Sequence, residues 1–271
     1  MIVRMRDTGR GPVVVLVPGV QGRWEWMRPA VDALARHCRV ITFSLCGEPG
    51  SRCEATGGFE RYARQIDMAL AQAQVDAAAI CGISFGGLIG LHYAARRPDR
   101  VRALALVSTP GPRWRPDRRQ QRYLAHPRLM APVFAAGAPF RLWPEVAAAL
   151  PDVRDRLRFV IRHTARVATA PIVPALMAER IRLSQTVAFE RECQAIDAPT
   201  LVVTGEPWLD RIVPPESTAE YVHLIRGACA ATMERTGHIG LVTRPRQFGE
   251  LIGDFVERVA SGPRTLEALH A

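Results

Sequence analysis

The chain has 271 residues, of which 48% are hydrophobic and 23% are charged. This length allows one large domain or two small ones, and the composition is sufficient for a sizeable buried core. The formal net charge of +10 comes from arginine alone, and because the arginines are scattered without flanking aromatic residues, we do not expect nucleic-acid binding.

Short apolar runs rich in β-branched residues alternate with amphipathic helical patterns along most of the chain. The runs expected as strands cover residues 13–19, 39–44, 77–82, 103–111, 200–206 and 230–238. Their apolarity is continuous rather than alternating, as in strands that are buried on both faces of a parallel sheet. Helical patterns cover residues 24–38, 59–73 and 245–260. The sequence therefore predicts an α/β fold with a mostly parallel central sheet flanked by helices.

One long segment, residues 112–198, breaks this rhythm. It contains no convincing strand and is rich in arginine, proline and alanine, with helical patterns over residues 145–168 and 174–192. We expect it to form a helical subdomain over one edge of the sheet. The predicted core then consists of residues 1–111 and 199–271.

The apolar runs, cysteines and histidines indicate where in the cell the protein is expected and whether it holds a disulfide or a metal. The N-terminus lacks the apolar stretch of a secretory signal, and no apolar run approaches the length of a membrane span. The six cysteines include no C-x-x-C pair, and the seven histidines show no metal-ligand spacing. We therefore expect a cytoplasmic protein with neither disulfides nor a metal, and without a membrane span.

Ser84 lies in the stretch G-I-S-F-G-G, between an expected strand and an expected helix. A serine at such a turn projects outward at the carboxyl end of the sheet, and Gly82 and Gly86 avoid clashes in the tight turn. The backbone N–H of Phe85, at the start of the helix, is placed to stabilise an oxyanion. The alternative is a structural serine in a glycine-rich turn, but the strand and helix on either side favour a nucleophile.

A second oxyanion donor is expected from the loop that follows the first strand. In "VLVPGVQGRW", Gly19 and Gly22 bracket Val20 and Gln21, so the N–H of Val20 is free to point toward Ser84. An ordinary strand-to-helix turn is the alternative at this position.

A base and an acid follow later in the chain. His238 comes directly after the last strand, while the other histidines lie within helices, in the insertion or in the tail. Asp210 follows the strand before it, at the same carboxyl edge, and Glu206 is the fallback acid. Asp210 would otherwise serve as a cap for the helix after Pro214. The order Ser84, Asp210, His238 is the one found in α/β-hydrolases.

Nearly the whole chain resembles the α/β-hydrolase fold superfamily, specifically its single-domain enzymes with a helical cap. "GISFGG" is similar to the nucleophile elbow, "GEPWLDRIVP" to the acid loop and "TGHIGLVTRP" to the histidine loop. The resemblance implies a catalytic triad of Ser84, Asp210 and His238 with the N–H groups of Val20 and Phe85 as oxyanion hole. It also implies that residues 112–198 are the cap.

Two departures from the family pattern concern loops around the expected site. The oxyanion strand usually ends in His-Gly but here ends in Pro18-Gly19, so the hydrogen bonds that anchor this loop must differ. The loop that usually begins with aspartate begins here with Ser44.

These residues predict a serine hydrolase that cleaves a small-molecule ester, thioester or related acyl compound without a cofactor. Alternatives on the same triad are carbon–carbon bond hydrolysis and acyl transfer, and a non-catalytic ligand-binding protein is a further alternative. We expect the substrate to contact tryptophans near the oxyanion loop and in the insertion, namely Trp24, Trp26, Trp114 and Trp143. The sequence does not predict the oligomeric state.

Overall fold

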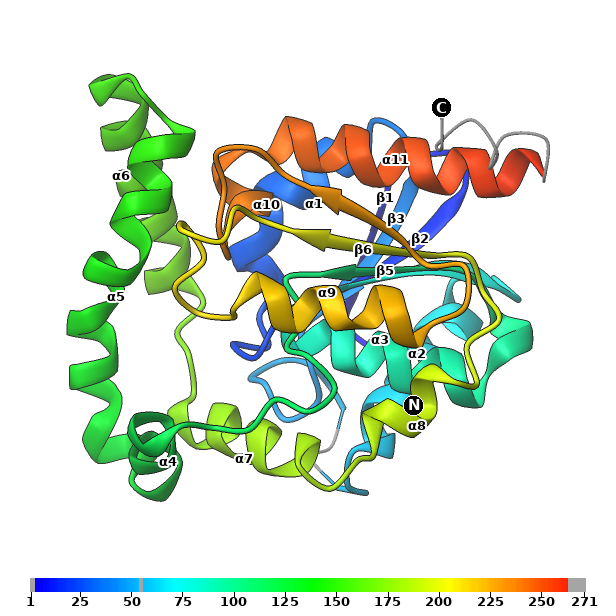
Figure 1. Cartoon of the computed structure of the whole chain (residues 1–271), viewed down its shortest axis with the longest axis horizontal. Coiled ribbons are helices and arrows are strands. Elements are labelled where there is room, and N and C mark those ends of the chain that lie inside the picture. The colour runs from blue at the N-terminus through cyan, green and yellow to red at the C-terminus, as the bar shows by residue number, and fades with distance from the viewer. Residues whose placement is uncertain (1–2, 54–55, 263–271) are drawn as a thin grey trace.

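The computed structural model describes residues 3–53 and 56–262 around a seven-stranded sheet of order β1-β3-β2-β4-β5-β6-β7 (Figure 1). The strands are β1 (Met5–Thr8), β2 (Val13–Val17), β3 (Arg39–Phe43), β4 (Ala78–Ile83), β5 (Val101–Val107), β6 (Thr200–Thr204) and β7 (Cys229–Thr232). All neighbouring strands pair in parallel except β1, which runs antiparallel to β3. The predicted α/β fold with a mostly parallel sheet is confirmed, and β1 is an additional edge strand.

Helices cover both faces of the sheet, which explains why the strands are apolar throughout. On one face lie α1 (Arg28–Leu34), α10 (Gly240–Thr243) and α11 (Pro245–Ser261), with the short 3₁₀ helix η1 (Trp24–Met27) leading into α1. On the other lie α2 (Glu60–Gln72), α3 (Phe85–Arg96), α8 (Phe189–Cys193) and α9 (Pro215–Leu224). A second 3₁₀ turn, η2 (Pro98–Arg100), joins α3 to β5.

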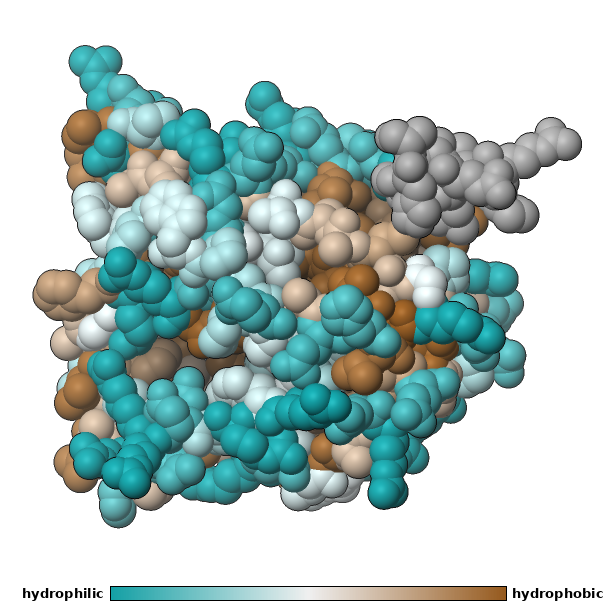
Figure 2. Space-filling view, in the orientation of Figure 1, coloured by the Kyte–Doolittle hydropathy of each residue, from teal (hydrophilic) through white to brown (hydrophobic). Residues whose placement is uncertain are grey.

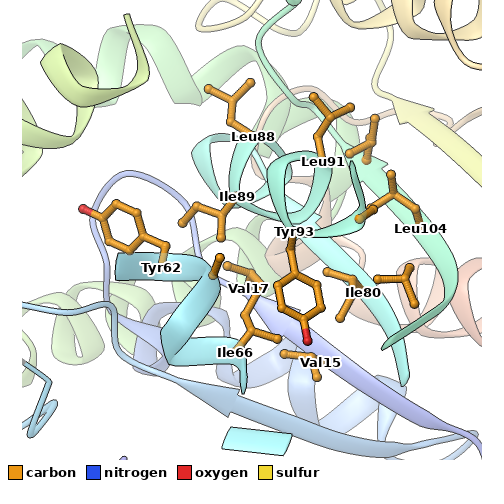
Figure 3. Close-up of a cluster of buried hydrophobic side chains, with 14 of the residues drawn as sticks. Val15, Val17, Tyr62, Ile66, Ile80, Leu88, Ile89, Leu91, Tyr93 and Leu104 are labelled. Carbon is orange, nitrogen blue, oxygen red and sulfur yellow. The ribbon is translucent and has the colours of Figure 1, made fainter. Parts of the chain in front are cut away.

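The helix that follows Ser84 is held rigidly by the core. Figure 3 shows Leu88, Ile89 and Leu91 of α3 in one apolar cluster with Val17 of β2 and Ile66 of α2. These side chains are buried, so α3 is packed tightly against the sheet and against its neighbour α2. The turn between β4 and α3 therefore has little freedom to change its conformation.

The helices between β5 and β6 form a separate feature. They are α4 (Arg118–Ala125), α5 (Pro127–Ala149), α6 (Val153–Thr169) and α7 (Pro174–Ser184), followed by α8. In Figure 1, α5 and α6 stand beyond the end of the sheet toward which β6 and β7 point. We call α4–α7 the cap helices, and the predicted domain limits at 112 and 198 stay a prediction. The helical pattern over residues 145–168 is divided between α5 and α6, because Pro151 and the N-cap Asp152 interrupt it.

Large apolar side chains are exposed mainly on two of these helices, α5 and α6. Brown and tan residues lie along the edge of Figure 2 that these helices occupy. The exposed apolar residues there are Leu129, Val133, Phe140, Trp143, Val153, Leu157, Val160 and Ile161. Within the described ranges, no helix is long and apolar enough to cross a membrane.

A disulfide joins Cys46 to Cys53 in the loop after β3. The expectation that the chain forms no disulfide is therefore wrong. The reason is local geometry: Gly47 N–H donates to the Cys53 carbonyl and Ser51 N–H to that of Glu48, so the loop folds back on itself. Spacing in the sequence does not reveal such a reversal. Among the described residues, Cys38, Cys81, Cys193 and Cys229 are free thiols.

Candidate active site

Ser84 occupies a strained turn at the carboxyl end of β4. Its φ and ψ are 52° and −119°, a conformation that residues other than glycine rarely adopt and that occurs mainly at functional sites. Hydrogen bonds hold this backbone on both sides, because Ser84 N–H donates to Val107 and Gly87 N–H donates to Ser84. The turn is the strand-to-helix elbow that the sequence predicts.

Both flanking glycines are required by close backbone contacts. A Cβ on Gly82 would lie 2.3 Å from the Gly86 carbonyl oxygen, and one on Gly86 would lie 2.3 Å from the Val17 carbonyl oxygen. The second contact also shows that the elbow packs directly on the end of β2. Parallel pairing of Val17 with Gly82 brings the two strand ends side by side.

The loop after β2 consequently lies next to Ser84. A Cβ built on Gly19 would be 3.6 Å from the Ser84 Cβ, so the peptide groups around Val20 border the serine. Gly22 N–H donates to the Gly19 carbonyl at 2.9 Å, which closes a tight turn over residues 19–22. Phe85 is the first residue of α3, where backbone N–H groups have no partner within the helix.

Arg180, on α7, supplies the loop with an anchor. Its Nη1 donates to the Val20 carbonyl at 2.9 Å, and its guanidinium lies over Gly22, where a Cβ would approach Nη1 to 2.5 Å. The side chain is fully buried. The loop that follows Pro18-Gly19 is thus tied to the cap helix α7.

A buried carboxylate neutralises this arginine. Arg180 Nη2 lies 2.6 Å from Glu48 Oε1, and both side chains have an exposed fraction of 0%. Burial raises the pKa of Glu48, although the neighbouring Arg180 charge acts in the opposite direction. Glu48 belongs to the loop closed by the Cys46–Cys53 disulfide, so this loop, the turn at Val20 and α7 are joined through one guanidinium.

Replacing Arg180 by methionine is expected to lower the free energy of unfolding by about 3–5 kcal/mol, because Glu48 would retain a buried charge without its partner. Urea denaturation of the variant measures this loss. The double variant R180M/E48Q should recover part of the stability, since it removes the unpaired charge. An R180M variant as stable as the wild type would show that the ion pair does not hold these loops together.

Asp210 and His238 form the second part of the site, beyond β6 and β7. His238 Nδ1 lies 3.2 Å from Asp210 Oδ2, and Asp210 Oδ1 accepts from the N–H groups of Ile212 and Val213 at 2.9 Å each. Both side chains are more than nine-tenths buried. Glu206, the fallback acid, instead accepts from the backbone N–H of Arg235.

The ionisation of this pair follows from its contacts. Burial opposes ionisation of Asp210, but the His238 charge, its hydrogen bond and the two backbone donors lower the pKa of Asp210 below its usual value. Burial likewise lowers the pKa of His238, but Asp210 outweighs it and Glu145 adds to the effect, so the pKa of His238 lies above 6.5. Asp210 thus holds the imidazole and stabilises its protonated form.

Ser84, Asp210 and His238 therefore share the carboxyl edge of the sheet, after β4, β6 and β7. Within the described part of the chain, no hydrogen bond joins Ser84 Oγ to His238. In enzymes without substrate, hydrogen bonds between catalytic groups are often long and tighten on binding. His92, a histidine of α3, is instead bonded to Glu60 and Glu192, at 3.0 and 2.8 Å.

The four predicted substrate tryptophans lie in different settings. Trp24 packs against the core beside α1 under the Arg6 guanidinium, and Trp114 is half-buried after β5. Trp26 joins core to cap, because its Nε1 donates to the Ala170 carbonyl at 2.9 Å. Trp143 is half exposed on α5. The structure does not bring the four together, and their role in substrate binding stays a prediction.

Charged residues of the cap helices that contact the site were not predicted. Arg180 and Glu145 carry no motif, and arginines and glutamates are common in this segment. Only their burial in the folded chain sets them apart. In the described ranges, no group of three histidine, cysteine or acidic side chains is arranged to hold a metal ion.

Comparison with known proteins places this chain in a family. The profile of the alpha/beta hydrolase fold family matches residues 12–245. The chain belongs to the alpha/beta hydrolase fold family. Its relatives include enzymes named as esterases and hydrolases.

Among the relatives is a pimeloyl-[acyl-carrier protein] methyl ester esterase of Neisseria meningitidis serogroup A. It is 32% identical over 206 residues, which make up 73% of this chain and 64% of that relative's length. The chain thus spans less than two thirds of this relative's length. A further match, 28% identical over 262 residues, covers 92% of the chain but 12% of a polyketide synthase of Burkholderia thailandensis.

Solved structures share the fold. An enol-lactonase from Burkholderia xenovorans superposes with a TM-score of 0.74 at 23% identity, covering 94% of this chain and 96% of the lactonase. An esterase from Thermogutta terrifontis superposes with a TM-score of 0.72 at 22% identity, covering 95% and 93% of the two chains. At this level of identity the likeness concerns the fold alone.

Proposed function

We propose that this hydrolase cleaves a carboxylic ester or thioester through an acyl-enzyme on Ser84. The observation that supports this most is the buried Asp210–His238 pair at the same edge of the sheet as a serine in a strained turn. A nucleophile, a base and an acid that orients the base are the groups that acyl transfer requires.

In the proposed mechanism, His238 removes the proton from Ser84 Oγ as the oxygen attacks the substrate carbonyl. The N–H groups of Val20 and Phe85 stabilise the oxyanion of the tetrahedral intermediate. His238 then donates its proton to the leaving alcohol or thiol. A water molecule, deprotonated by His238, attacks the acyl-enzyme. The free acid is released as His238 returns the proton to Ser84 Oγ.

The substrate class is proposed from one relative. The Neisseria enzyme is named for a methyl ester of an acyl chain carried by a protein. We propose that the present enzyme likewise acts on an ester of an acyl chain, with the cap helices covering the acyl part. The absence of a cofactor and the cytoplasmic location remain predictions from the sequence.

The test is hydrolysis of methyl esters and thioesters of graded acyl length, measured by release of the free acid. We expect kcat/KM to rise with chain length, because each buried methylene contributes about 0.8 kcal/mol. Adding an acceptor alcohol tests for acyl transfer: a transfer product at the expense of free acid would favour an acyltransferase. Acid release from a β-diketone instead of any ester would favour the carbon–carbon hydrolase. Ligand binding without turnover of any substrate would favour a binding protein.

A further inference from the structure

Glu145 is a buried carboxylate of the cap helix α5 that contacts the loop carrying His238. Its side chain has an exposed fraction of 1%. Both of its oxygens lie 3.0 Å from the backbone nitrogen of Ile239. The backbone of Gly237, on the other side of His238, also acts on this carboxylate by lowering its pKa. The residue that directly follows His238 is therefore bonded to this carboxylate through its backbone.

A second contact supports the same junction. Arg235, at the start of the histidine loop, donates from Nε to the Ala148 carbonyl at 2.8 Å, one turn after Glu145 on α5. The loop is thus attached to α5 at both of its ends. Loops that carry catalytic residues need such supports, because small displacements of a catalytic group have large effects on the rate.

The charge of Glu145 also acts on the Asp210–His238 pair. Burial raises the pKa of Glu145 and the Asp210 charge adds to this, whereas the N–H groups of Ile239 and Gly237 and the His238 charge lower it. The net result is a pKa of about 7. In return, ionised Glu145 adds to the effect of Asp210 in raising the pKa of His238. Two carboxylates therefore act on His238. Asp210 bonds the imidazole ring directly, whereas Glu145 bonds the backbone N–H of the next residue, Ile239.

We propose that Glu145 is a positioning residue for His238, which fixes the histidine loop against α5 and stabilises the imidazolium formed during acyl transfer. This inference rests on the proposed function only where it concerns turnover. The attachment of the loop and the charge effect on His238 are properties of the folded chain. They are measurable without a substrate.

The sign of the charge effect predicts a pH dependence. His238 must be neutral to accept the Ser84 proton, so activity is lost as the pH falls through its raised pKa. Changing Glu145 to glutamine keeps an acceptor for the Ile239 N–H but removes the charge. The pKa of His238 should then fall, which moves the acidic limb of the kcat/KM profile to lower pH.

The experiment compares the wild type, E145Q, E145A and the control E179Q. Glu179 lies on the cap helix α7 and pairs with Arg61 at 2.9 Å, away from the histidine loop. We expect E145A to lower kcat by about 10- to 100-fold with little change in KM. E145Q should shift the pH profile with a smaller loss of kcat, and E179Q should match the wild type in both.

An NMR titration of the His238 ring in the wild type and E145Q provides a readout besides activity. A lower His238 pKa in E145Q supports the proposal even if no ester is hydrolysed, in which case the proposed function fails alone. An unchanged His238 pKa in E145Q overturns the inference. So does a loss of thermal stability in E145A with unchanged kcat and pH profile, because Glu145 would then be purely structural.

Discussion

Replacing Ser84 by alanine is expected to lower kcat for ester hydrolysis by on the order of 10⁵- to 10⁶-fold, since nucleophile and base act as one unit. Initial rates of acid release at saturating substrate measure this loss. The fold should be unaffected, because the strained backbone at Ser84 is held by hydrogen bonds of the main chain, which alanine retains.

A matched control for this variant is Ser108→Ala. Ser108 is another buried serine with a positive φ, at the end of the neighbouring strand β5. Removing the Ser108 hydroxyl should leave kcat near the wild-type value. Full activity of S84A, or a loss in S108A as large as in S84A, would contradict the assignment of Ser84 as nucleophile.

Changing Asp210 to asparagine is expected to lower kcat by about 10³- to 10⁴-fold. The amide still accepts from Ile212 and Val213, so the loop should keep its shape. Toward His238, however, asparagine offers no negative charge and holds the imidazole less well in the required tautomer. Because Asp210 raises the pKa of His238, that pKa should also fall in the variant.

A Glu206→Gln variant tests whether Asp210 or the fallback candidate, Glu206, is the acid that orients His238. Glu206 lies in the same loop but bonds the backbone of Arg235 rather than the His238 ring. We expect E206Q to keep nearly full activity in the same assay. If E206Q loses as much activity as D210N, the acid must be reassigned.

Much of this arrangement is predictable from the sequence because it depends on local signals. Continuous apolar runs give the parallel strands, and glycines around Ser84 give the elbow. Once the sheet is parallel, residues that follow its strands meet at one edge. That rule alone is sufficient to predict that Asp210 and His238 lie at the same edge. Strand β1 was not predicted because its sequence, Met-Arg-Asp-Thr, is short and polar, which is typical of a strand at the edge of a sheet.

The contacts between the cap helices and the loops of the candidate site depend on the folded chain. Arg180 and Glu145 resemble any other charged residue of an arginine-rich helical segment until packing buries them. The Cys46–Cys53 disulfide likewise depends on a chain reversal that spacing does not indicate. The pattern of α6 identifies an amphipathic helix, but Leu157 and Ile161 of its apolar side are exposed. Periodicity shows that a helix has two faces and does not show what covers them.

The central claim, that Ser84 is the nucleophile activated by His238, is tested most directly by covalent labelling. The wild-type protein is incubated with a fluorophosphonate probe, and the modified peptide is identified by mass spectrometry. We predict a single adduct on Ser84 that is absent from S84A and strongly reduced in a His238→Ala variant. Labelling of S84A at the wild-type rate, or an adduct on another residue, would contradict the account.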